Sequence, residues 1–201
     1  MDEVLEAIRQ RRSIRRYTDE PVSREQLETI LQAGRFAPSA ENRQPWRFII
    51  ITDRNAIAQL STKIKEGIRR LLRYRFIAQL WLKELRDRDI LKLLYGAGYV
   101  KQDIIFFDAP AVIFIVTTDL LFNDESCACA AQNMMLAAHA LGLGSCWIGF
   151  ASVLGLKKTV LQDIGIPEDY HIAATLIFGH PQGSLQPPMR NPMADVINWI
   201  D

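Results

Sequence analysis

Apolar and polar residues alternate along this chain with a period that changes several times, and each change predicts a new element. Residues 2–12 and 23–36 carry apolar positions at helical spacing, three and four residues apart. Ser23, followed by Gln26 three residues later, forms a capping box that marks the start of the second helix. Residues 53–95 keep the helical spacing and are strongly charged, which predicts two or three further helices.

Short runs of β-branched and aromatic residues predict buried strands between these helices. The runs are Trp46–Thr52, Pro110–Thr117, Ser145–Ile148 and Tyr170–Phe178. A further helix is predicted over Leu154–Ile164, between the last two strands. Because the chain shows no internal repeat and no linker, these elements predict one α+β domain over residues 1–201, with a sheet of four or five strands flanked by helices.

Two segments are more apolar than a free surface allows. Asp124–Leu141 has helical spacing but hardly a polar side, so we expect it to be buried all round, at the centre of a subunit or in a dimer interface. The tail contains several prolines and ends in an apolar stretch, which we expect to dock on a sheet of this chain or of a partner. The apolar residues of that stretch are Val196, Ile197, Trp199 and Ile200.

The composition excludes several classes of protein. The 201 residues are 49% hydrophobic and 23% charged, which gives too much apolar surface for a disordered chain. Three cysteines are too few for a disulfide scaffold, so we expect Cys127 and Cys129 to be buried thiols, and we expect no metal site. With neither an apolar run of membrane-spanning length nor a signal-peptide pattern, the sequence predicts a cytoplasmic protein with no membrane partner.

The net charge of +1 conceals two basic clusters. Residues 61–92 hold ten Lys or Arg against four Asp or Glu. We interpret this stretch as a solvated helical face rather than a surface that steers anionic NADPH. We expect no nucleic-acid partner, because the remainder of the chain carries a net negative charge. Residues 9–16 hold five Arg and no acid, which suggests a small anionic ligand.

The second cluster contains the first motif with chemical meaning, Arg11-Arg12-Ser13-Ile14-Arg15. Arg guanidinium groups bind phosphate oxygens in a bidentate manner, and a Ser hydroxyl adds one donor. Three Arg and one Ser within five residues can therefore surround a phosphate. The alternative is a solvated basic face whose arginines pair with nearby carboxylates, those of Asp19, Glu20 or Glu25.

Two further motifs have both a ligand-binding and a structural interpretation. The loop over residues 38–46 presents Ser39, Asn42 and Gln44, whose side chains can contact the edge of a heterocycle or simply stabilise an ordinary turn. Residues 142–149 read Gly-x-Gly-x-x-x-x-Gly after a helix and before a strand, which is the wrong order for a dinucleotide-binding fingerprint. Small residues there can admit a flat ligand close to the backbone, or form a helix C-cap followed by a buried strand.

Taken in order, these motifs and several others resemble the FMN-dependent nitroreductase family over nearly the whole chain. No single motif is specific to this family, but the complete set of motifs in this order is. The matching segments are residues 11–17, 37–39, 42–46, 107–110, 131–138, 142–149 and 179–181. The resemblance implies an α+β fold with a central, mostly antiparallel sheet, and a homodimer that holds two FMN molecules at the subunit interface.

By position, the resemblance assigns the FMN phosphate and ribityl chain to Arg11, Arg12 and Ser13. Arg15 would face the pyrimidine side of the flavin, where a cation stabilises the negative charge that reduction creates. Arg190, in the tail, would close on the phosphate.

The resemblance assigns further residues to the flavin ring. Gln102 would contact the ring edge. Packing beside the ring, with one backbone N–H directed at N5, would come from Trp147, Ile148 and Gly149. The other subunit would supply loop residues, namely Pro38, Ser39, Asn42 and Gln44. Residues 61–100 occupy the place of a variable lid over the flavin, and residues 181–201 that of an arm exchanged between subunits.

The implied activity is that of an FMN-dependent oxidoreductase. Electrons pass from NAD(P)H to the bound FMN and, after the nicotinamide leaves, to a nitroaromatic, quinone or similar acceptor in a ping-pong cycle. Two alternatives stay open. One is a flavoenzyme of the same fold with different chemistry, such as reductive dehalogenation, ring desaturation or flavin fragmentation. The other is a non-catalytic nucleotide-binding module.

Overall fold

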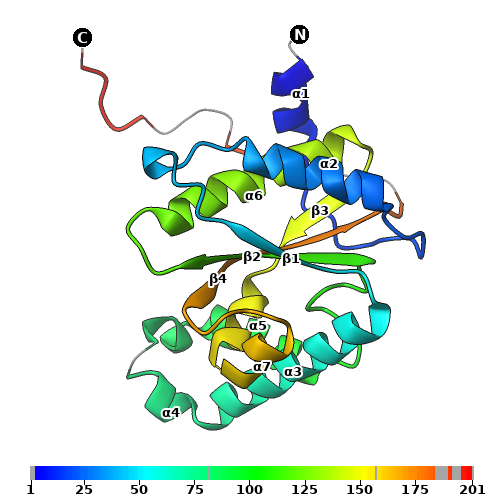
Figure 1. Cartoon of the computed structure of the whole chain (residues 1–201). Helices are drawn as coiled ribbons and strands as arrows, with labels where there is room; N and C mark the ends of the chain where they lie inside the picture. The colour runs from blue at the N-terminus through cyan, green and yellow to red at the C-terminus, as the bar shows by residue number, and fades with distance from the viewer. Residues whose placement is uncertain (1–2, 81, 157, 184–189, 192–195, 201) are drawn as a thin grey trace.

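A four-stranded antiparallel sheet with helices on both faces forms the centre of the molecule (Figure 1). The structure is a computed structural model and describes residues 3–80, 82–156, 158–183, 190–191 and 196–200. The sheet has the order β1-β2-β4-β3, with β1 (Arg47–Ile51), β2 (Ala111–Thr118), β3 (Gly144–Trp147) and β4 (Tyr170–Gly179). The predicted α+β class and antiparallel sheet are confirmed.

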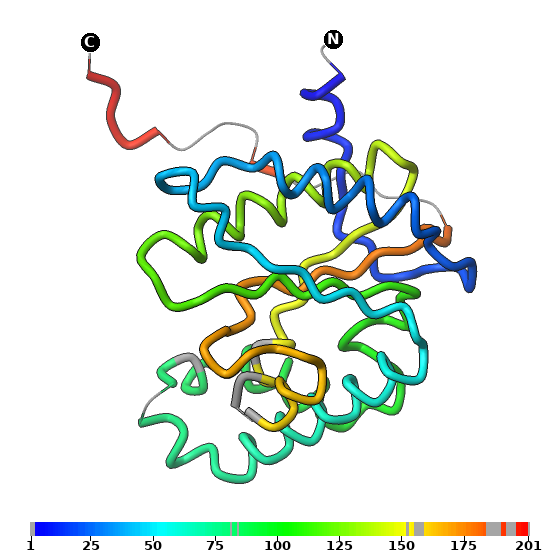
Figure 2. The backbone as a smooth tube through the Cα atoms, viewed as in Figure 1, coloured from blue at the N-terminus to red at the C-terminus, as the bar shows by residue number. Residues whose placement is uncertain are grey.

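Two layers of helices cover the sheet (Figure 1). One layer contains α2 (Arg24–Arg35) and α6 (Asn123–Ala140), and α1 (Glu3–Gln10) projects from this side of the molecule. The other contains α3 (Arg54–Arg73), α4 (Arg75–Ala78), α5 (Arg88–Tyr99) and α7 (Lys158–Asp163), with the 3-10 segments η2 (Lys83–Arg86) and η3 (Gly149–Leu156). Figure 2 shows that both ends of the described chain lie on the α2–α6 side. None of the described helices is both long and apolar enough to cross a membrane.

Strand β2 is apolar throughout because both of its faces are buried. Ile113 and Ile115 join the core on the α2–α6 side, whereas Phe114 and Val116 join the core on the α3–α5 side. Successive side chains of a strand point to opposite faces, so one strand contributes to both cores. This is why the sequence shows an unbroken apolar run there instead of an alternating one.

A short segment after α1 extends the sheet beyond β3. Ser13 forms an isolated parallel bridge with Ser145, and the Ile14 N–H donates to the Ser145 carbonyl oxygen at 2.9 Å. Farther along, Tyr17 forms an antiparallel bridge with Pro181. The Arg-Ser motif of residues 11–15 therefore lies along the edge of the sheet.

Two helices with strong apolar patterns are only partly covered. α6 buries one face, including Met134, but Cys129 on the same helix is exposed. The single chain therefore does not bury this helix all round, because the sheet and α2 cover only one side of it, and burial of the other side in a dimer interface stays a prediction. α1 buries none of its residues, and its apolar positions Val4, Leu5 and Ile8 are between 48% and 61% exposed.

The end of the chain is also uncovered. Val196, Ile197, Trp199 and Ile200 are exposed, so they do not dock on this chain's own sheet. Docking on a partner, and the arm over residues 181–201, stay predictions; residues 184–189 and 192–195 lie outside the described part of the chain.

The helix predicted over residues 154–164 is confirmed in part. The helix α7 covers residues 158–163, whereas residues 154–156 belong to the 3-10 segment η3. Gly155 lowers the helix propensity at the start of the predicted helix and favours a tighter turn there. η3 also approaches α3 closely, since a Cβ added at Gly67 would come within 2.7 Å of Val153.

The basic segment over residues 61–92 is largely engaged within the chain. Lys65 Nζ donates to the carbonyl oxygens of Val100 and Gln102, and Arg69 donates to the carbonyl oxygen of Gly98 at 2.9 Å. These two cations of α3 therefore neutralise the carbonyl end of α5, where a helix favours positive charge. The interpretation of residues 61–92 as a solvated helical face and their role as a lid both stay predictions.

Candidate flavin site

Three side chains of the Arg-Ser motif, those of Arg11, Ser13 and Arg15, lie along the edge of the sheet beside β3. Ser13 pairs with Ser145 on β3, Arg11 lines a cavity with Gly144, and the guanidinium of Arg15 lies over the ring of Phe107. Burial raises the pKa of the neighbouring Cys146 thiol, and the cation of Arg15 lowers it. Ile14, between Ser13 and Arg15, is buried against β3.

Gly144, at the start of β3, makes the close packing of Ile14 possible. A Cβ added at Gly144 would come within 2.8 Å of the Ile14 side chain. Gly144 thus allows the edge segment to approach β3, and this close contact explains the small residue without a ligand.

The neighbouring carboxylates do not neutralise the motif. Asp19 pairs with Arg54 at 3.0 Å, and Glu20 faces His180 at 3.6 Å. None of the ion pairs among the described residues includes Arg11 or Arg15. The interpretation of the motif as a self-paired basic face is therefore not supported for Asp19 or Glu20, and the residues fit a phosphate-bearing ligand.

Arg12 occupies a different position from its neighbours. Its Nη1 donates to the carbonyl oxygens of Arg9, Gln10 and Arg11, at 2.9 Å for Arg9 and 3.0 Å for Arg11. A cation at the carbonyl end of a helix is stabilising, so Arg12 caps α1 here. Its predicted contact with the phosphate stays a prediction.

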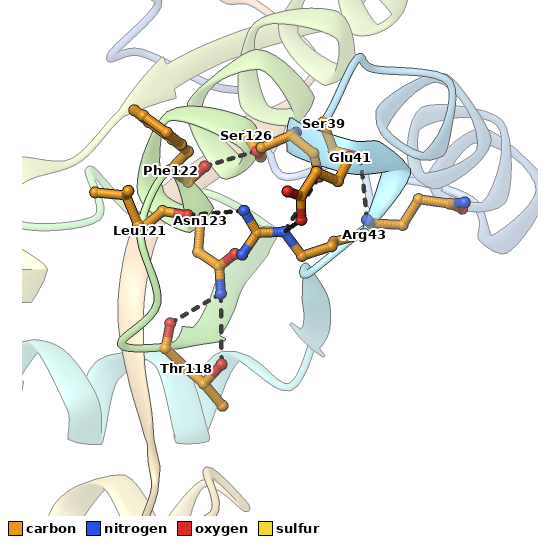
Figure 3. Close-up of polar contacts among 10 residues, drawn as sticks. Ser39, Glu41, Arg43, Thr118, Leu121, Phe122, Asn123 and Ser126 are labelled. Atoms are coloured by element: carbon orange, nitrogen blue, oxygen red, sulfur yellow. Dashed lines mark hydrogen bonds and ion pairs between the residues drawn. The ribbon is translucent and has the colours of Figure 1, made fainter.

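The second predicted group of site residues lies in the loop around η1 (Ala40–Asn42), which is held against the start of α6 (Figure 3). The Gln44 N–H donates to Ser39 Oγ at 3.0 Å, and the Gln44 side-chain amide donates to Asn42 Oδ1 at 3.2 Å. Glu41, Asn42 and Gln44 all have positive φ values, between 48° and 54°. Such strain at a residue with a Cβ persists only where surrounding contacts enforce it, and it concentrates at functional sites.

Two contacts from α6 and the turn before it provide that enforcement. Ser126 Oγ accepts from the Ala40 N–H at 3.3 Å, and Arg43 donates to the Leu121 carbonyl oxygen at 3.2 Å. Arg43 also pairs with Glu41 at 3.4 Å, so its guanidinium lies between the loop and the turn (Figure 3). The loop is thus a rigid element even though it has little regular structure.

The two groups of site residues lie at opposite ends of α6. Ser126 near the start of α6 holds the loop, whereas His139 in the last turn lies close enough to Arg11 to have its pKa lowered by that cation. Thirteen residues at 1.5 Å each separate these two positions by about 20 Å. Within one chain, the loop and the Arg-Ser motif therefore do not converge on the same small ring.

The residues predicted beside the flavin ring follow directly after the Arg-Ser edge. Trp147 is 39% exposed, Gly149 is exposed, and Ile148 between them is buried. The Ile148 N–H already donates to the Thr175 carbonyl oxygen at 2.9 Å, so it is not the donor expected for N5. Gln102 is exposed, and only its carbonyl oxygen is fixed, by Lys65. Arg190 is described and exposed.

One residue near this site was missed by sequence reasoning, His139. It lines a cavity of about 140 Å³ together with Arg11, Arg12 and Gly144. Its position in the last helical turn, three residues before Gly142, was the available signal. The pKa of His139 lies below its usual value because of burial first, and then because of Arg12 and Arg11.

We expect His139 to make the FMN-free protein less stable as the pH falls. A histidine with a lowered pKa in the folded state binds its proton more readily in the unfolded state, so acid favours unfolding. The loss begins as the pH drops through the usual histidine value of 6.5. Urea unfolding of His139→Gln should show a smaller decrease in stability between about pH 7.5 and about pH 5.5 than the wild type. Equal decreases would contradict this assignment.

A model of the nitroreductase family matches residues 8–180 of the chain. The chain belongs to the nitroreductase family. The resemblance drawn from the ordered motifs is therefore confirmed, and the match covers both groups of site residues except for Arg190 in the tail.

Several relatives of this nitroreductase-family chain are named as nitroreductases or flavin reductases. It is 32% identical over 200 aligned residues to a nitrobenzene nitroreductase of Ectopseudomonas oleovorans, which covers 89% of this chain and 86% of the relative. It is 29% identical over 184 residues to an FMN reductase (NAD(P)H) of Bacillus subtilis, covering 90% and 67%. A nitroreductase with bound FMN from Bacteroides fragilis matches with a TM-score of 0.81 and 25% identity over 100% of both chains.

Proposed function

We propose that this chain binds FMN along the sheet edge and uses it to pass electrons from NAD(P)H to a small organic acceptor. The observation that carries the proposal is the place of the Arg-Ser motif along the sheet edge, where Ser13 pairs with Ser145, Arg11 lines a cavity, and the nearest carboxylates are engaged elsewhere. The named activities of the relatives and the FMN in the matching crystal structure support it. The chain is thus an FMN-dependent oxidoreductase of the nitroreductase family.

Each side chain of the edge has a separate task in this proposal. Arg11 and Ser13 bind and orient the phosphate, since a guanidinium and a hydroxyl supply charged and neutral donors. Arg15 presents a cation to the pyrimidine edge of the ring. When bound, FMN supplies the redox chemistry by accepting two electrons from NAD(P)H and giving them to the acceptor. The protein therefore provides binding and electrostatics rather than a nucleophile.

We further propose that two chains build each site. On one chain the loop of residues 38–44 contacts Ser126 near the start of α6, whereas Arg11 lies beside His139 in its last turn, about 20 Å away along the helix, so a second copy supplies the loop. The uncovered apolar surface supports this: α1 buries nothing, Phe36 is 84% exposed, and residues 196–200 are exposed. An eight-residue helix with no buried face is not stable in water without a partner.

Paired substitution of Leu5 and Ile8 by Glu should test the dimer. We expect the wild type to have about twice the chain mass of 22.9 kDa in light scattering, and the double variant to shift toward the single-chain mass. The double variant should also bind FMN more weakly, because the loop from the second chain is lost. Leu93→Glu, which changes an exposed leucine in the α3–α5 layer, is the matched control and should stay dimeric. A wild-type protein that is monomeric with full FMN affinity would contradict the two-chain site.

The acceptor class is tested by steady-state kinetics. We expect NAD(P)H oxidation by the FMN-loaded protein to accelerate when a nitroaromatic or a quinone is added, well above the rate with oxygen alone. Stimulation by neither compound would refute this acceptor class while leaving FMN binding intact.

A further inference from the structure

The turn between α5 and β2 is organised by a single carboxylate, that of Asp103. Its Oδ1 accepts hydrogen bonds from Ser61 Oγ at 2.6 Å and from the N–H groups of Ile105 and Phe106 at 3.0 and 3.2 Å. Its Oδ2 accepts from the Asp108 N–H at 3.3 Å. Four donors on one carboxylate fix the path of the backbone through this turn.

Helix α3 anchors the turn from one face. Ser61, Lys65 and Arg69 are four residues apart and therefore lie along the same side of the helix. Ser61 binds Asp103, and the two cations bind the end of α5 and the carbonyl oxygen of Gln102. The side chain of Ser61 is buried, with 4% exposed, so its hydroxyl is committed to this contact.

The anchored turn holds Phe107 in a conformation that a phenylalanine does not adopt on its own. Its φ is 56°, in the left-handed region, and a residue with a Cβ keeps such a conformation only where its surroundings enforce it. Phe106 on one side is fully buried, and Phe107 itself is partly buried, packed against the core on the α3–α5 side. The ring of Phe107 lies beneath the guanidinium of Arg15, with Cζ 5.8 Å from the ring centroid.

We propose that Asp103 is a positioning residue of the flavin site: by fixing the turn, it holds Phe107 beneath Arg15 and so sets where that cation stands. This inference rests on the proposed function, in which Arg15 faces the pyrimidine edge of FMN. An arginine has several flexible torsions, and a ring beneath its guanidinium reduces the freedom of the charged group. Ser61 contributes to the same positioning, because its hydroxyl on α3 donates a hydrogen bond to the Asp103 carboxylate.

A positioning role of Asp103 and a purely electrostatic role predict shifts of opposite sign in the reduction potential of bound FMN. A cation held near the pyrimidine edge stabilises reduced FMN, so loosening Arg15 lowers the reduction potential of the bound flavin. Removing the negative charge of Asp103 would, through charge alone, raise that potential. The sign of the shift therefore separates positioning from direct electrostatics.

The test is the midpoint potential of bound FMN, measured by anaerobic dye-coupled titration in the full-length protein. The variants are Phe107→Leu, Ser61→Ala, Asp103→Asn and Arg15→Gln, with Asp89→Asn as a charge-matched control on the exposed surface of α5. We expect the first three to weaken binding of reduced relative to oxidised FMN about fivefold, or about −20 mV for a two-electron couple. Adding Phe107→Leu to Arg15→Gln should give no further shift.

Each outcome decides a different point. Unchanged potentials in Phe107→Leu and Ser61→Ala, with a shift in Arg15→Gln, would overturn the inference and leave the proposed function in place. A positive shift confined to Asp103→Asn would also overturn it, because Asp103 would then act through its charge. An unchanged midpoint potential in Arg15→Gln would also overturn the inference, because Arg15 would then have no influence on the flavin. A wild-type protein that binds no FMN would instead refute the proposed function. Phe107→Leu keeps the test decisive if Asp103→Asn does not fold.

Discussion

Arg11→Ala is expected to weaken FMN binding about tenfold to a hundredfold and to leave the fold intact. Hydrogen bonds to a charged group contribute about 1.5–3 kcal/mol, and Arg11 is proposed to make such bonds with the phosphate. The side chain is only partly buried and joins no ion pair among the described residues, so its loss creates no cavity and leaves no carboxylate unpaired. The change therefore acts on the ligand and not on the core.

Quenching of flavin fluorescence during titration of the FMN-free protein measures this loss. Ser13→Ala should weaken binding by a smaller factor, because a hydroxyl contributes one neutral donor. Arg24→Ala, at an exposed arginine of α2 that pairs with Glu28, is the matched control and should bind like the wild type. Riboflavin, which lacks the phosphate, should bind the wild type and Arg11→Ala equally. If FMN affinity is unchanged in both Arg11→Ala and Ser13→Ala, the phosphate assignment is wrong.

Phe114→Ala should destabilise the folded chain by about 3–5 kcal/mol, the range for removing a large buried aromatic side chain. Phe114 is fully buried in the central strand, where it is paired with Ile49 on β1 and Thr175 on β4. The neighbouring strands and the α3–α5 layer enclose the ring, so the space it leaves cannot readily collapse. The result would be a cavity at the centre of the sheet.

Urea unfolding followed by circular dichroism gives the stability change. Phe76→Ala provides the comparison, because the ring of Phe76 on α4 is 72% exposed and its removal should change stability by no more than about 0.5 kcal/mol. A cost for Phe114→Ala as small as that for Phe76→Ala would show that the described core is not the one that stabilises the chain.

Local patterns in the sequence predict most of the fold. The four strands lie where runs of β-branched residues place them, and the capping box of Ser23 and Gln26 forms in the structure with both hydrogen bonds. These signals depend on residues a few positions apart. The helix predicted over residues 154–164 is found only over residues 158–163, because a glycine and close packing of η3 against α3 favour a 3-10 segment before it.

The sequence correctly predicts that α1 and α6 carry apolar faces, but it does not predict which surface covers those faces. Cys129 is exposed in the single chain because that chain provides no second cover for α6, and its burial in a dimer interface stays a prediction. Hydrophobic spacing states that a face must be buried; it does not state whether the same chain or a second copy buries it.

The residues of the candidate site also differ in whether local sequence patterns predict them. Arg11, Ser13 and Arg15 could be predicted because they lie together in one motif. Asp103 could not, because its main side-chain partner, Ser61, is 42 residues away and the two meet only through the packing of α3. His139 and Arg11, which line the same cavity, are even farther apart along the chain. Sequence reasoning thus finds residues that bind a ligand directly more readily than residues that hold others in place.

The most direct test of the account is the visible spectrum of the purified protein during anaerobic addition of NAD(P)H. The account predicts a yellow protein with one FMN per chain, whose flavin absorption is bleached by about one equivalent of NAD(P)H. It also predicts that a nitroaromatic or quinone restores the absorption. A colourless protein that takes up no added FMN, or bound FMN that NAD(P)H does not reduce, would contradict it.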